Sequence, residues 1–298
     1  MRILPPGAVP IEVEMRKENS YHIEWVEPRD LAALKVIEEV QVAAWPDSRI
    51  APAHVLEILA ETGGQLLAAR TDDTHQIIGF ALAFLAKNDG PVKHPGIPED
   101  ELFIASYMVG VLPEHQGGLG YELKQAQRYH ALRRGIRWMQ WTYYPMSTRN
   151  GALNFRKLGG CSYKFVPNKY GMHSSGLPTD RLIVLWDMQH PGPVPFPHAC
   201  VPLTRRDSDW KPVLDEKALD AAAVGTGPPA LICSVPIEFV KLRERDIDAA
   251  CAWQDIFGQV ATTLLTAEAH WSVANFRVSE DKEEGHYLFI RYDASEKQ

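Results

Sequence analysis

The sequence lacks the patterns that mark disulfide frameworks, metal centres and serine hydrolases. Its 298 residues include only four cysteines, far apart and without a CxxC pair, so we predict free thiols in a reducing cytoplasm. The eleven histidines form no HExxH pair, and no metal site is predicted. A GxSxG nucleophile elbow is also missing, which argues against a serine hydrolase.

Long apolar runs and an excess of positive charge are missing as well. The net charge is -7, which gives no support to a nucleic-acid partner. The apolar stretch "GFALAFLA" is far shorter than the roughly 20 residues that span a bilayer, so no membrane partner is predicted. The opening stretch "MRILPPGAVPIEVEM" has two early prolines and no apolar signal-peptide core, and we therefore expect a cytoplasmic protein.

What the sequence does contain is an ordinary globular composition, 45% hydrophobic and 23% charged, with clear periodicity. Asp30 is expected to cap a helix with apolar residues at spacing three, and Gly63-Gly64 to end the next helix. A first domain over residues 1–190 is predicted. Its expected elements are a strand at 21–28, two helices ending at 64, strands at 65–71, 76–86 and 102–112, a helix ending at Gly135, a strand at 136–145, a helical stretch at 149–160 and strands at 161–171 and 180–188.

The remainder of the chain begins with five prolines in the thirteen residues 190–202. Such density indicates a linker or an extended surface strap, which we place at residues 191–227. Residues 228–298 follow the pattern strand, helix, strand, strand, and are predicted to form a small α/β extension. The strap and the extension could close over a site or form a homodimer interface, and the sequence leaves both open.

One stretch asks for a functional explanation: "VLPEHQGGLGYELKQAQRYHALRRG", residues 111–135, where a strand becomes a helix. Gly117, Gly118 and Gly120 could form a tight turn and nothing more. They could also bring bare backbone N–H groups, together with the positive end of the helix dipole, close to a phosphate. No Walker motif or GxGxxG is present, which disfavours nucleoside triphosphates and dinucleotides.

The surroundings of this loop resemble a known superfamily. "VGVLPEHQGGLG", a tryptophan-rich strand and "RNGALNFRKLGG" resemble the GNAT superfamily of acyl-CoA-dependent N-acyltransferases over about residues 20–188. "PEHQGGLGYELKQAQR", "WTYYPMSTRN", "NFRKLG" and "TDRLIVLW" resemble one bacterial branch of it with an appended C-terminal region. The resemblance implies a GNAT-like α/β fold, with a mixed, mostly antiparallel sheet flanked by helices and the small C-terminal extension.

The resemblance also implies a reaction and a cofactor site. An acetyl or succinyl group would pass from acetyl-CoA or another acyl-CoA to the amine of a small molecule such as an amino acid, without a metal. Strands 104–111 and 137–143 would separate, and the end of the first, at Val109 and Val111, would pair with the pantetheine amides. The other predicted cofactor contacts are Gln116, Gly117, Gly118, Leu119, Gly120 and Tyr121 around the pyrophosphate, together with Asn150 and Phe155.

Proton handling is the least determined part of this prediction. A free alkylamine has a pKa near 10 and must lose a proton before it attacks. The strand "FIASYMVGV" contains no carboxylate, so Glu101 just before it, and Ser106 or Tyr107 through a water, are the candidate bases. The superfamily often has a tyrosine where Phe155 stands, whose hydroxyl protonates the leaving thiolate. Tyr143, Tyr163 and Tyr170 are possible substitutes if the fold brings one of them close, and Tyr143 is the one predicted to be catalytic.

Two arginines and one rival function complete the sequence-based expectations. Arg149 and Arg181 follow or begin predicted elements, where a guanidinium could bind the carboxylate of a substrate or form a surface salt bridge. The rival is a degenerate GNAT domain that binds CoA or a metabolite as a sensor or interaction module. Phe155 and the carboxylate-free strand favour the rival, whereas the glycine loop favours the enzyme.

Overall fold

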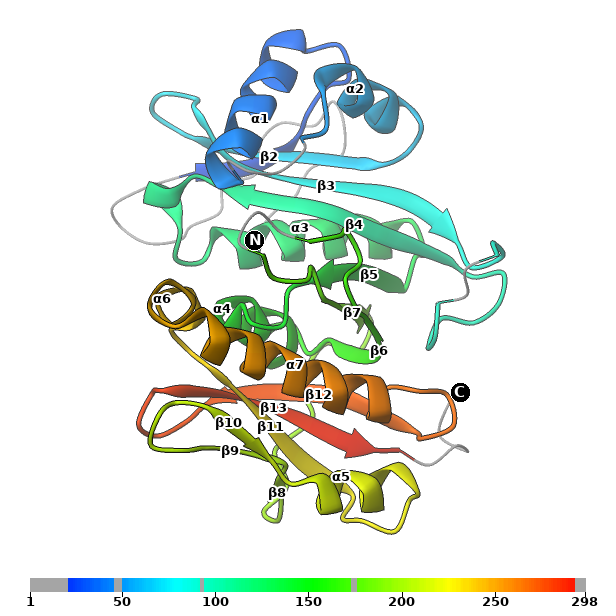
Figure 1. Ribbon diagram of the computed structural model, residues 1–298. Helices are drawn as coiled ribbons and strands as arrows, with labels where there is room; N and C mark the ends of the chain where they lie inside the picture. Colours follow the sequence, from blue (N-terminus) through cyan, green and yellow to red (C-terminus); the bar gives the residue numbers. More distant parts are fainter. Residues whose placement is uncertain (1–20, 46–49, 92–93, 173–175, 293–298) are drawn as a thin grey trace. The chain divides into compact units, whose positions relative to one another are not determined.

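The computed structural model describes residues 21–45, 50–91, 94–172 and 176–292 of the chain. The N-terminal stretch in which no signal peptide was predicted lies outside these residues. The chain forms two compact units (Figure 1). Unit 1 comprises residues up to 93 and 97–140, and unit 2 comprises residues 94–96 and 141 onward. The predicted domain boundaries near residues 190 and 227 stay a prediction.

Unit 1 is built on a mostly antiparallel sheet. Its strands lie in the order β1-β2-β3-β4-β5, with antiparallel pairing except between β4 and β5, which are parallel. The strands are β1 (Tyr21–Trp25), β2 (Gln65–Thr71), β3 (Ile77–Lys87), β4 (Leu102–Val111) and the first three residues of β5 (Trp138–Tyr143). The predicted hairpin of β2 and β3 is confirmed.

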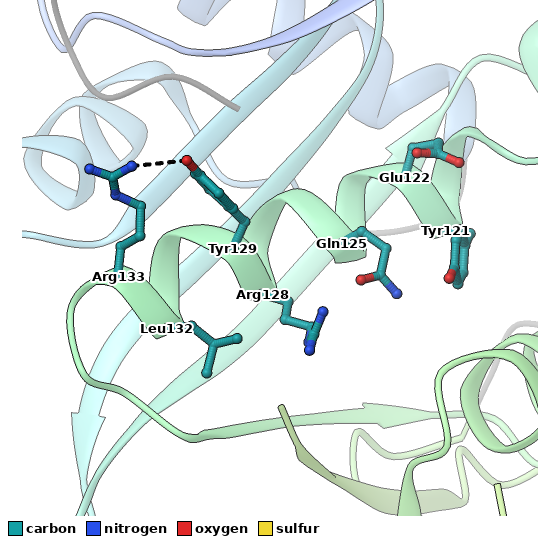
Figure 2. A pocket seen from close by; sticks show the side chains of 7 residues that line it. All are labelled: Tyr121, Glu122, Gln125, Arg128, Tyr129, Leu132 and Arg133. Atoms are coloured by element: carbon teal, nitrogen blue, oxygen red, sulfur yellow. Dashed lines mark hydrogen bonds between the residues drawn. The ribbon is translucent and has the colours of Figure 1, made fainter. Parts of the chain in front are cut away.

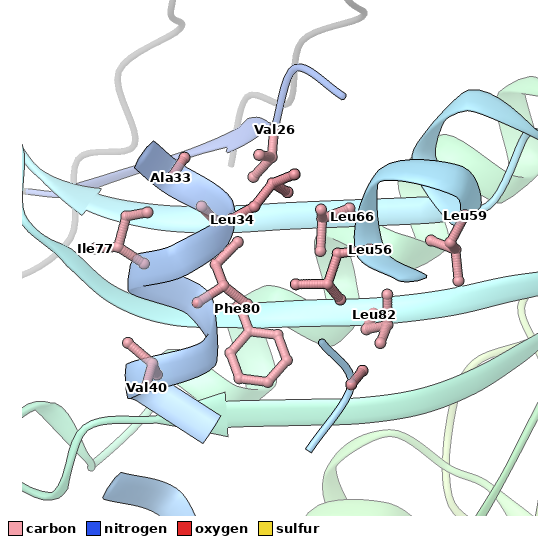
Figure 3. Close-up of a cluster of buried hydrophobic side chains, with 13 residues drawn as sticks. Val26, Ala33, Leu34, Val40, Leu56, Leu59, Leu66, Ile77, Phe80 and Leu82 are labelled. Carbon is pink, nitrogen blue, oxygen red and sulfur yellow. The ribbon is translucent and has the colours of Figure 1, made fainter. Parts of the chain in front are cut away.

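Helices cover both faces of this sheet. α1 (Leu31–Ala44) and α2 (Ala53–Glu61) lie on one face, and α3 (Leu119–Arg133) lies on the other (Figure 1). The Asp30 carboxylate accepts a hydrogen bond from the Ala33 N–H at 3.0 Å and caps α1, as the sequence predicted. Phe80 and Leu34 belong to the buried cluster that joins α1 and α2 to the sheet (Figure 3). A short 3₁₀-helix, Pro113–His115, leads from β4 toward α3.

Unit 2 contains a second, mostly antiparallel set of strands. The order is β7-β6-β12-β13-β11-β8, and only β11 and β8 are parallel. α7 packs against β11 and β6. The strands are β6 (Cys161–Val166), β7 (Arg181–Asp187), β8 (Val201–Pro202), β11 (Ala230–Pro236), β12 (Trp271–Val278) and β13 (Glu284–Arg291). The helices are α4 (Thr148–Gly151), which continues into a π-helical turn (Ala152–Lys157), α5 (Glu216–Ala223), α6 (Phe239–Arg245) and α7 (Ile247–Leu264).

The predicted fold class is confirmed: a mixed α/β protein with a largely antiparallel sheet and flanking helices. The segment expected to be a linker or strap is more regular than its prolines indicated. It contains β8, α5 and a two-stranded hairpin of β9 (Thr204–Arg206) and β10 (Pro212–Leu214). Two of the prolines fit this structure, because Pro202 lies on the edge strand β8 and Pro212 begins β10, positions where proline is tolerated in a sheet.

Three general properties follow from the described residues. None of their helices combines the length and the apolar character needed to cross a bilayer. Within the same residues, His, Cys, Asp and Glu side chains nowhere gather in a group of three that could hold a metal ion. The four cysteines, Cys161, Cys200, Cys233 and Cys251, are free thiols.

Candidate functional site

The central strand β4 is paired on both edges for only part of its length. Its residues 103–105 pair with residues 138–140 of β5. Among the described residues, 106–111 pair with β3 only. Alternate N–H and C=O groups of a strand point to opposite edges, so this part of β4 presents a row of backbone donors and acceptors away from β3.

A β-bulge lies where the second edge of β4 becomes free. The register against β3 shifts between the pairs Leu82–Met108 and Ala83–Ser106, so that Tyr107 is the extra residue. The Tyr107 side chain is 57% exposed, and its ring lies edge-on to Phe84 with 5.8 Å between the centroids. The bulge separates this exposed tyrosine from its neighbour Ser106, which is buried.

Ser106 joins a buried polar cluster beneath α3. Lys124 Nζ donates to Ser106 Oγ at 2.7 Å, and Ser106 Oγ donates to Gln127 Oε1 at 2.9 Å. The same Nζ lies 4.0 Å from the sulfur of Met139 on β5. We name Ser106, Lys124 and Gln127 the serine–lysine cluster. It lies at the residue where the pairing of β4 with β5 ends.

Lys124 is the residue that the sequence analysis missed. Its side chain is 4% exposed, and burial lowers the pKa of its ammonium well below the usual range, because a charged group loses its hydration there. Burial therefore shifts the balance of Lys124 toward the neutral amine, and a neutral amine can accept a proton. The sequence did contain an indication of this cluster. Lys124 and Gln127 are polar residues three positions apart on the helix, and each directly follows an apolar residue, Leu123 or Ala126.

The glycine loop enters α3 in an open conformation. Gly117 has φ +123° and Gly118 has φ +158°, which side chains rarely adopt. A Cβ placed on Gly117, Gly118 or Gly120 would meet no described atom within 4 Å. Gly120 therefore needs neither a positive φ nor close packing to explain its lack of a side chain. Its bare surface is available for approach from solvent.

The backbone donors of this loop have no acceptors within the described part of the chain. The N–H groups of residues 117–120 form no hydrogen bond there, whereas Tyr121 and Glu122 donate to the Gly118 carbonyl. Gly118 is the N-cap of α3 and supplies no side chain to satisfy these donors. Four adjacent N–H groups at the positive end of a 15-residue helix can bind an anion.

The outer surface of α3 is hollowed next to the loop. A pocket of about 570 Å³ begins at Tyr121, immediately after Gly120, and runs along the helix (Figure 2). Burial raises the pKa of the Glu122 carboxyl at its start. At the far end, Arg133 donates to the Tyr129 hydroxyl at 2.9 Å. The lining side chains are Tyr121, Glu122, Gln125, Arg128, Tyr129, Leu132 and Arg133.

Unit 1 contains most of the predicted site residues, but not all of them lie near the loop. Val109, Val111 and Leu119 pack into the core beneath α3, so only their backbone can contact a ligand. The Gln116 N–H is bonded to the Pro113 carbonyl at 3.4 Å. Glu101 precedes the other end of β4, about 16 Å from Ser106 at 3.3 Å per residue, and we leave it out of the candidate site.

The other predicted residues belong to unit 2. The Tyr143 hydroxyl donates to Tyr287 at 2.8 Å, and Phe155 is fully buried with its ring edge-on to both tyrosines. Within unit 2 these two side chains are therefore core residues. Asn150 is exposed on α4 next to Arg149, and Arg181 begins β7. The structure describes each set within its own unit, and the roles given to unit 2 residues stay predictions.

Acetyltransferases are among the solved structures to which the chain is similar. One is the ribosomal-protein-S18-alanine N-acetyltransferase from Escherichia coli, at 14% identity and a TM-score of 0.44, covering 60% of this chain and 98% of that chain. Another is Arabidopsis thaliana NAA60 in complex with acetyl-CoA, at 14% identity and 0.43, covering 56% and 99%. A third is an aminoglycoside 6'-acetyltransferase type Ii, at 14% identity and 0.41, covering 59% and 99%.

No family model and no curated protein matches the sequence. The similarities to solved structures are too low to carry a function to this chain. The function proposed next therefore rests on the chain's own geometry.

Proposed function

We propose that the chain is an acyl-CoA-dependent N-acyltransferase that moves an acetyl or succinyl group to the amine of a small molecule such as an amino acid. One observation carries the proposal. The unpaired edge of β4, residues 106–111, is followed, after the short 3₁₀-helix Pro113–His115, by the glycine loop with its four N–H donors. This arrangement offers a strand edge for an amide-containing arm and, at its end, a binding place for phosphate.

Acyl-CoA fits these features, because it joins a pyrophosphate, an arm with two amide groups and a thioester that supplies the acyl group. The N–H groups of residues 117–120 would hold the pyrophosphate. The edge of β4 at Val109 and Val111 would pair with the amides. Gly120 supports this assignment, because its missing side chain has no explanation in the packing or the backbone.

The serine–lysine cluster supplies a proton acceptor. The acceptor amine must lose a proton before it attacks. Ser106 Oγ would take that proton while its own hydroxyl, turned from Gln127 Oε1 toward Nζ, passes its proton to the amine form of Lys124, 2.7 Å away. Lys124 then carries the positive charge that the amine has lost, because one proton has in effect moved from the amine to Lys124 by way of Ser106. Tyr107, beside Ser106 and exposed, is positioned to contact the acceptor.

Substitution at Gly120 tests the cofactor site without disturbing the fold. Calorimetric titration with coenzyme A should show at least a tenfold weaker affinity for Gly120→Val, since a branched side chain would block approach to the N–H groups. Gly258→Ala in α7 is the matched control, because its Cβ would meet only Phe165 at 3.7 Å. We expect that control to bind coenzyme A as the wild type does. Unchanged binding by Gly120→Val would overturn the proposal.

The rival function, a domain that binds CoA or a metabolite without turnover, has one observation in its favour. Residues 106–111 of β4 contain no carboxylate to act as a base. Release of free thiol from acetyl-CoA or succinyl-CoA in the presence of pooled amines separates the two functions. Turnover would exclude the rival, whereas coenzyme A binding without thiol release would favour it.

A further inference from the structure

A second polar cluster lies in unit 2 at the start of β7. The guanidinium carbon of Arg181 is 5.7 Å from the ring centroid of Tyr144 and 5.1 Å from that of Tyr170. Arg181 Nη1 donates to the carbonyl of Asp180 at 2.7 Å. Among the described residues, the half-buried Arg181 forms no ion pair. Two aromatic rings therefore hold a cation whose remaining N–H donors have no carboxylate.

The nearest acid is already engaged elsewhere. Asp180 Oδ1 accepts the Asn168 N–H at 2.8 Å, and Asp180 Oδ2 accepts Gln254 Nε2 at 2.8 Å. Gln254 Oε1 in turn accepts the Tyr144 hydroxyl at 2.6 Å. This network holds the Tyr144 ring and occupies both oxygens of the Asp180 carboxylate. Arg181 is thus held in place without being neutralised by an ion pair.

Two further cations surround the same tyrosines. Lys169 Nζ lies 5.5 Å from the Tyr170 ring centroid. Burial and Asp180 raise the pKa of Tyr144, whereas the charges of Arg243 on α6 and of Arg181 act to lower it, so Arg243 is a further cation of this region. In the described part of the chain, neither Lys169 nor Arg243 forms an ion pair. Three cations, Arg181, Lys169 and Arg243, thus lie in this region without an ion pair among the described residues, and the Asp180 carboxylate accepts from two N–H donors.

We propose that Arg181, held between Tyr144 and Tyr170, binds the carboxylate of a small-molecule ligand. A guanidinium offers a planar pair of N–H donors that matches a carboxylate, and the flanking rings restrict its orientation. Tyr170 is 60% exposed, so a ligand can reach the cluster from solvent. A carboxylate would supply the counter-charge that this half-buried cation lacks.

The ligand's carboxylate could belong to the acceptor, as in an amino acid, or to the acyl group, as in a dicarboxylic acyl thioester. Its assignment as a substrate rests on the proposed function, whereas carboxylate binding does not. The geometry of unit 2 supports the shared chemistry, and the experiment separates the two sources.

Thermal unfolding of the full chain with matched pairs of probes provides the test. Phenylalanine is compared with phenethylamine, leucine with isoamylamine, and succinyl-CoA with acetyl-CoA, each in large excess. Ligand at about a hundredfold over its Kd adds roughly 2.7 kcal/mol, a shift of several degrees. We expect the carboxylate-bearing member of at least one pair to raise Tm more than its partner. An amino-acid excess identifies the acceptor as the source, and a succinyl-CoA excess identifies the acyl group.

Three variants assign that excess shift to the cluster. Arg181→Gln should abolish it, and Arg181→Lys, which keeps the charge but loses the two-pronged geometry, should reduce it. Arg277→Gln is the matched control, because Arg277 stacks on Phe196 at 4.5 Å elsewhere in unit 2. That control should keep the full excess. If Arg181→Gln unfolds, the Arg181→Lys result alone decides, and an undiminished excess would overturn the proposal.

The outcomes for the two proposals are distinguishable. Coenzyme A carries no carboxylate, so its own shift reports on the glycine loop of unit 1. A coenzyme A shift with no excess in any pair would overturn carboxylate binding and leave the proposed acyltransferase intact. An Arg181-dependent excess for an amino acid, without any coenzyme A shift, would support carboxylate binding and overturn the acyltransferase.

Discussion

The serine–lysine cluster of unit 1 and the tyrosine pair of unit 2 are both buried and hydrogen-bonded, yet they differ in how completely. Tyr143 donates to Tyr287 at 2.8 Å, and Tyr287 donates to the Pro145 carbonyl at 2.6 Å. Around the serine–lysine cluster, Gln127 Nε2 and Gln65 Oε1 are buried without a hydrogen-bond partner among the described residues. Both hydroxyls of the tyrosine pair therefore have an acceptor, whereas polar atoms in and beside the serine–lysine cluster lack a partner.

The surroundings of the tyrosine pair and of the serine–lysine cluster also differ. The tyrosine pair is enclosed by aromatic rings, including Phe155, Phe276 and Phe257. The serine–lysine cluster lies where the second edge of β4 becomes free, and it contains an amine whose charge is disfavoured by burial. A protein core tolerates polar groups when every bond is made, whereas a reactive site retains groups with spare capacity. The comparison therefore favours Ser106 over Tyr143 as the candidate for chemistry.

The largest expected effect is the loss of turnover in Lys124→Met. Removing a proton acceptor usually lowers kcat by a factor of about 100 or more. We expect that loss for thiol release from acyl-CoA, with coenzyme A affinity unchanged, because the glycine loop is untouched. Lys35→Met on the exposed face of α1 is the control and should leave kcat unaltered. Full activity in Lys124→Met would mean that this lysine is only a buried structural residue.

The second effect concerns stability against pH. Because the folded pKa of Lys124 is lowered from its ordinary value of 10.5, the unfolded chain binds a proton that the folded chain does not hold between the two values. The free energy of unfolding should therefore rise with pH across that interval, by at most about 1.4 kcal/mol per pH unit. Urea titrations from pH 7 to 10 would measure the slope. In Lys124→Met this contribution disappears, so the slope should fall and the stability at pH 7 should rise.

A smaller effect, a loss of stability, is expected when the hydroxyl of Tyr287 is removed from the tyrosine pair. Tyr287→Phe leaves both the Tyr143 hydroxyl and the Pro145 carbonyl buried without a partner. Unsatisfied groups of this kind cost about 1–3 kcal/mol. The free energy of unfolding, measured in urea, should fall by that amount while thiol release per folded molecule is retained. A selective loss of turnover would instead give the pair a catalytic role.

The smallest effect is expected for Tyr143→Phe. This change removes one hydrogen bond from Tyr287, which still donates to Pro145, and should cost about 1 kcal/mol. Burial holds the pKa of the Tyr143 phenol well above its usual range, which disfavours the phenolate that proton donation to a thiolate would produce. We expect kcat to stay within a factor of two. A tenfold loss would restore Tyr143 as a candidate acid.

The order of strands and helices could be predicted because it depends on local patterns. Apolar runs bounded by turn residues indicated β2, β3 and β4, and Asp30 marked the start of α1. The glycine loop was equally visible, since Gly117 and Gly118 serve a backbone conformation that a sequence displays directly. Regular structure in residues 191–227 was missed because prolines are compatible with short edge strands, and because the Asp215 cap of α5 was overlooked.

The site itself was only half predictable, because it depends on contacts between distant residues. Ser106 was named as a candidate, but its partner Lys124 lies 18 residues away on another element. Tyr143 was assigned a role that its partner Tyr287, 144 residues away, makes structural within unit 2. No local pattern reports such pairs. The spacing of Lys124 and Gln127 indicated a polar stripe on α3 without showing what it faces.

The unpaired edge of β4 also bears on the handling of the protein. An exposed strand edge can recruit any other extended chain, and native proteins usually protect such edges. Residues 106–111, "SYMVGV", combine β-branched and aromatic side chains with no charge or proline. If an extended ligand arm occupies this edge, the ligand also prevents another chain from pairing with it. The protein should then be most prone to form aggregates when it is purified without that ligand and concentrated.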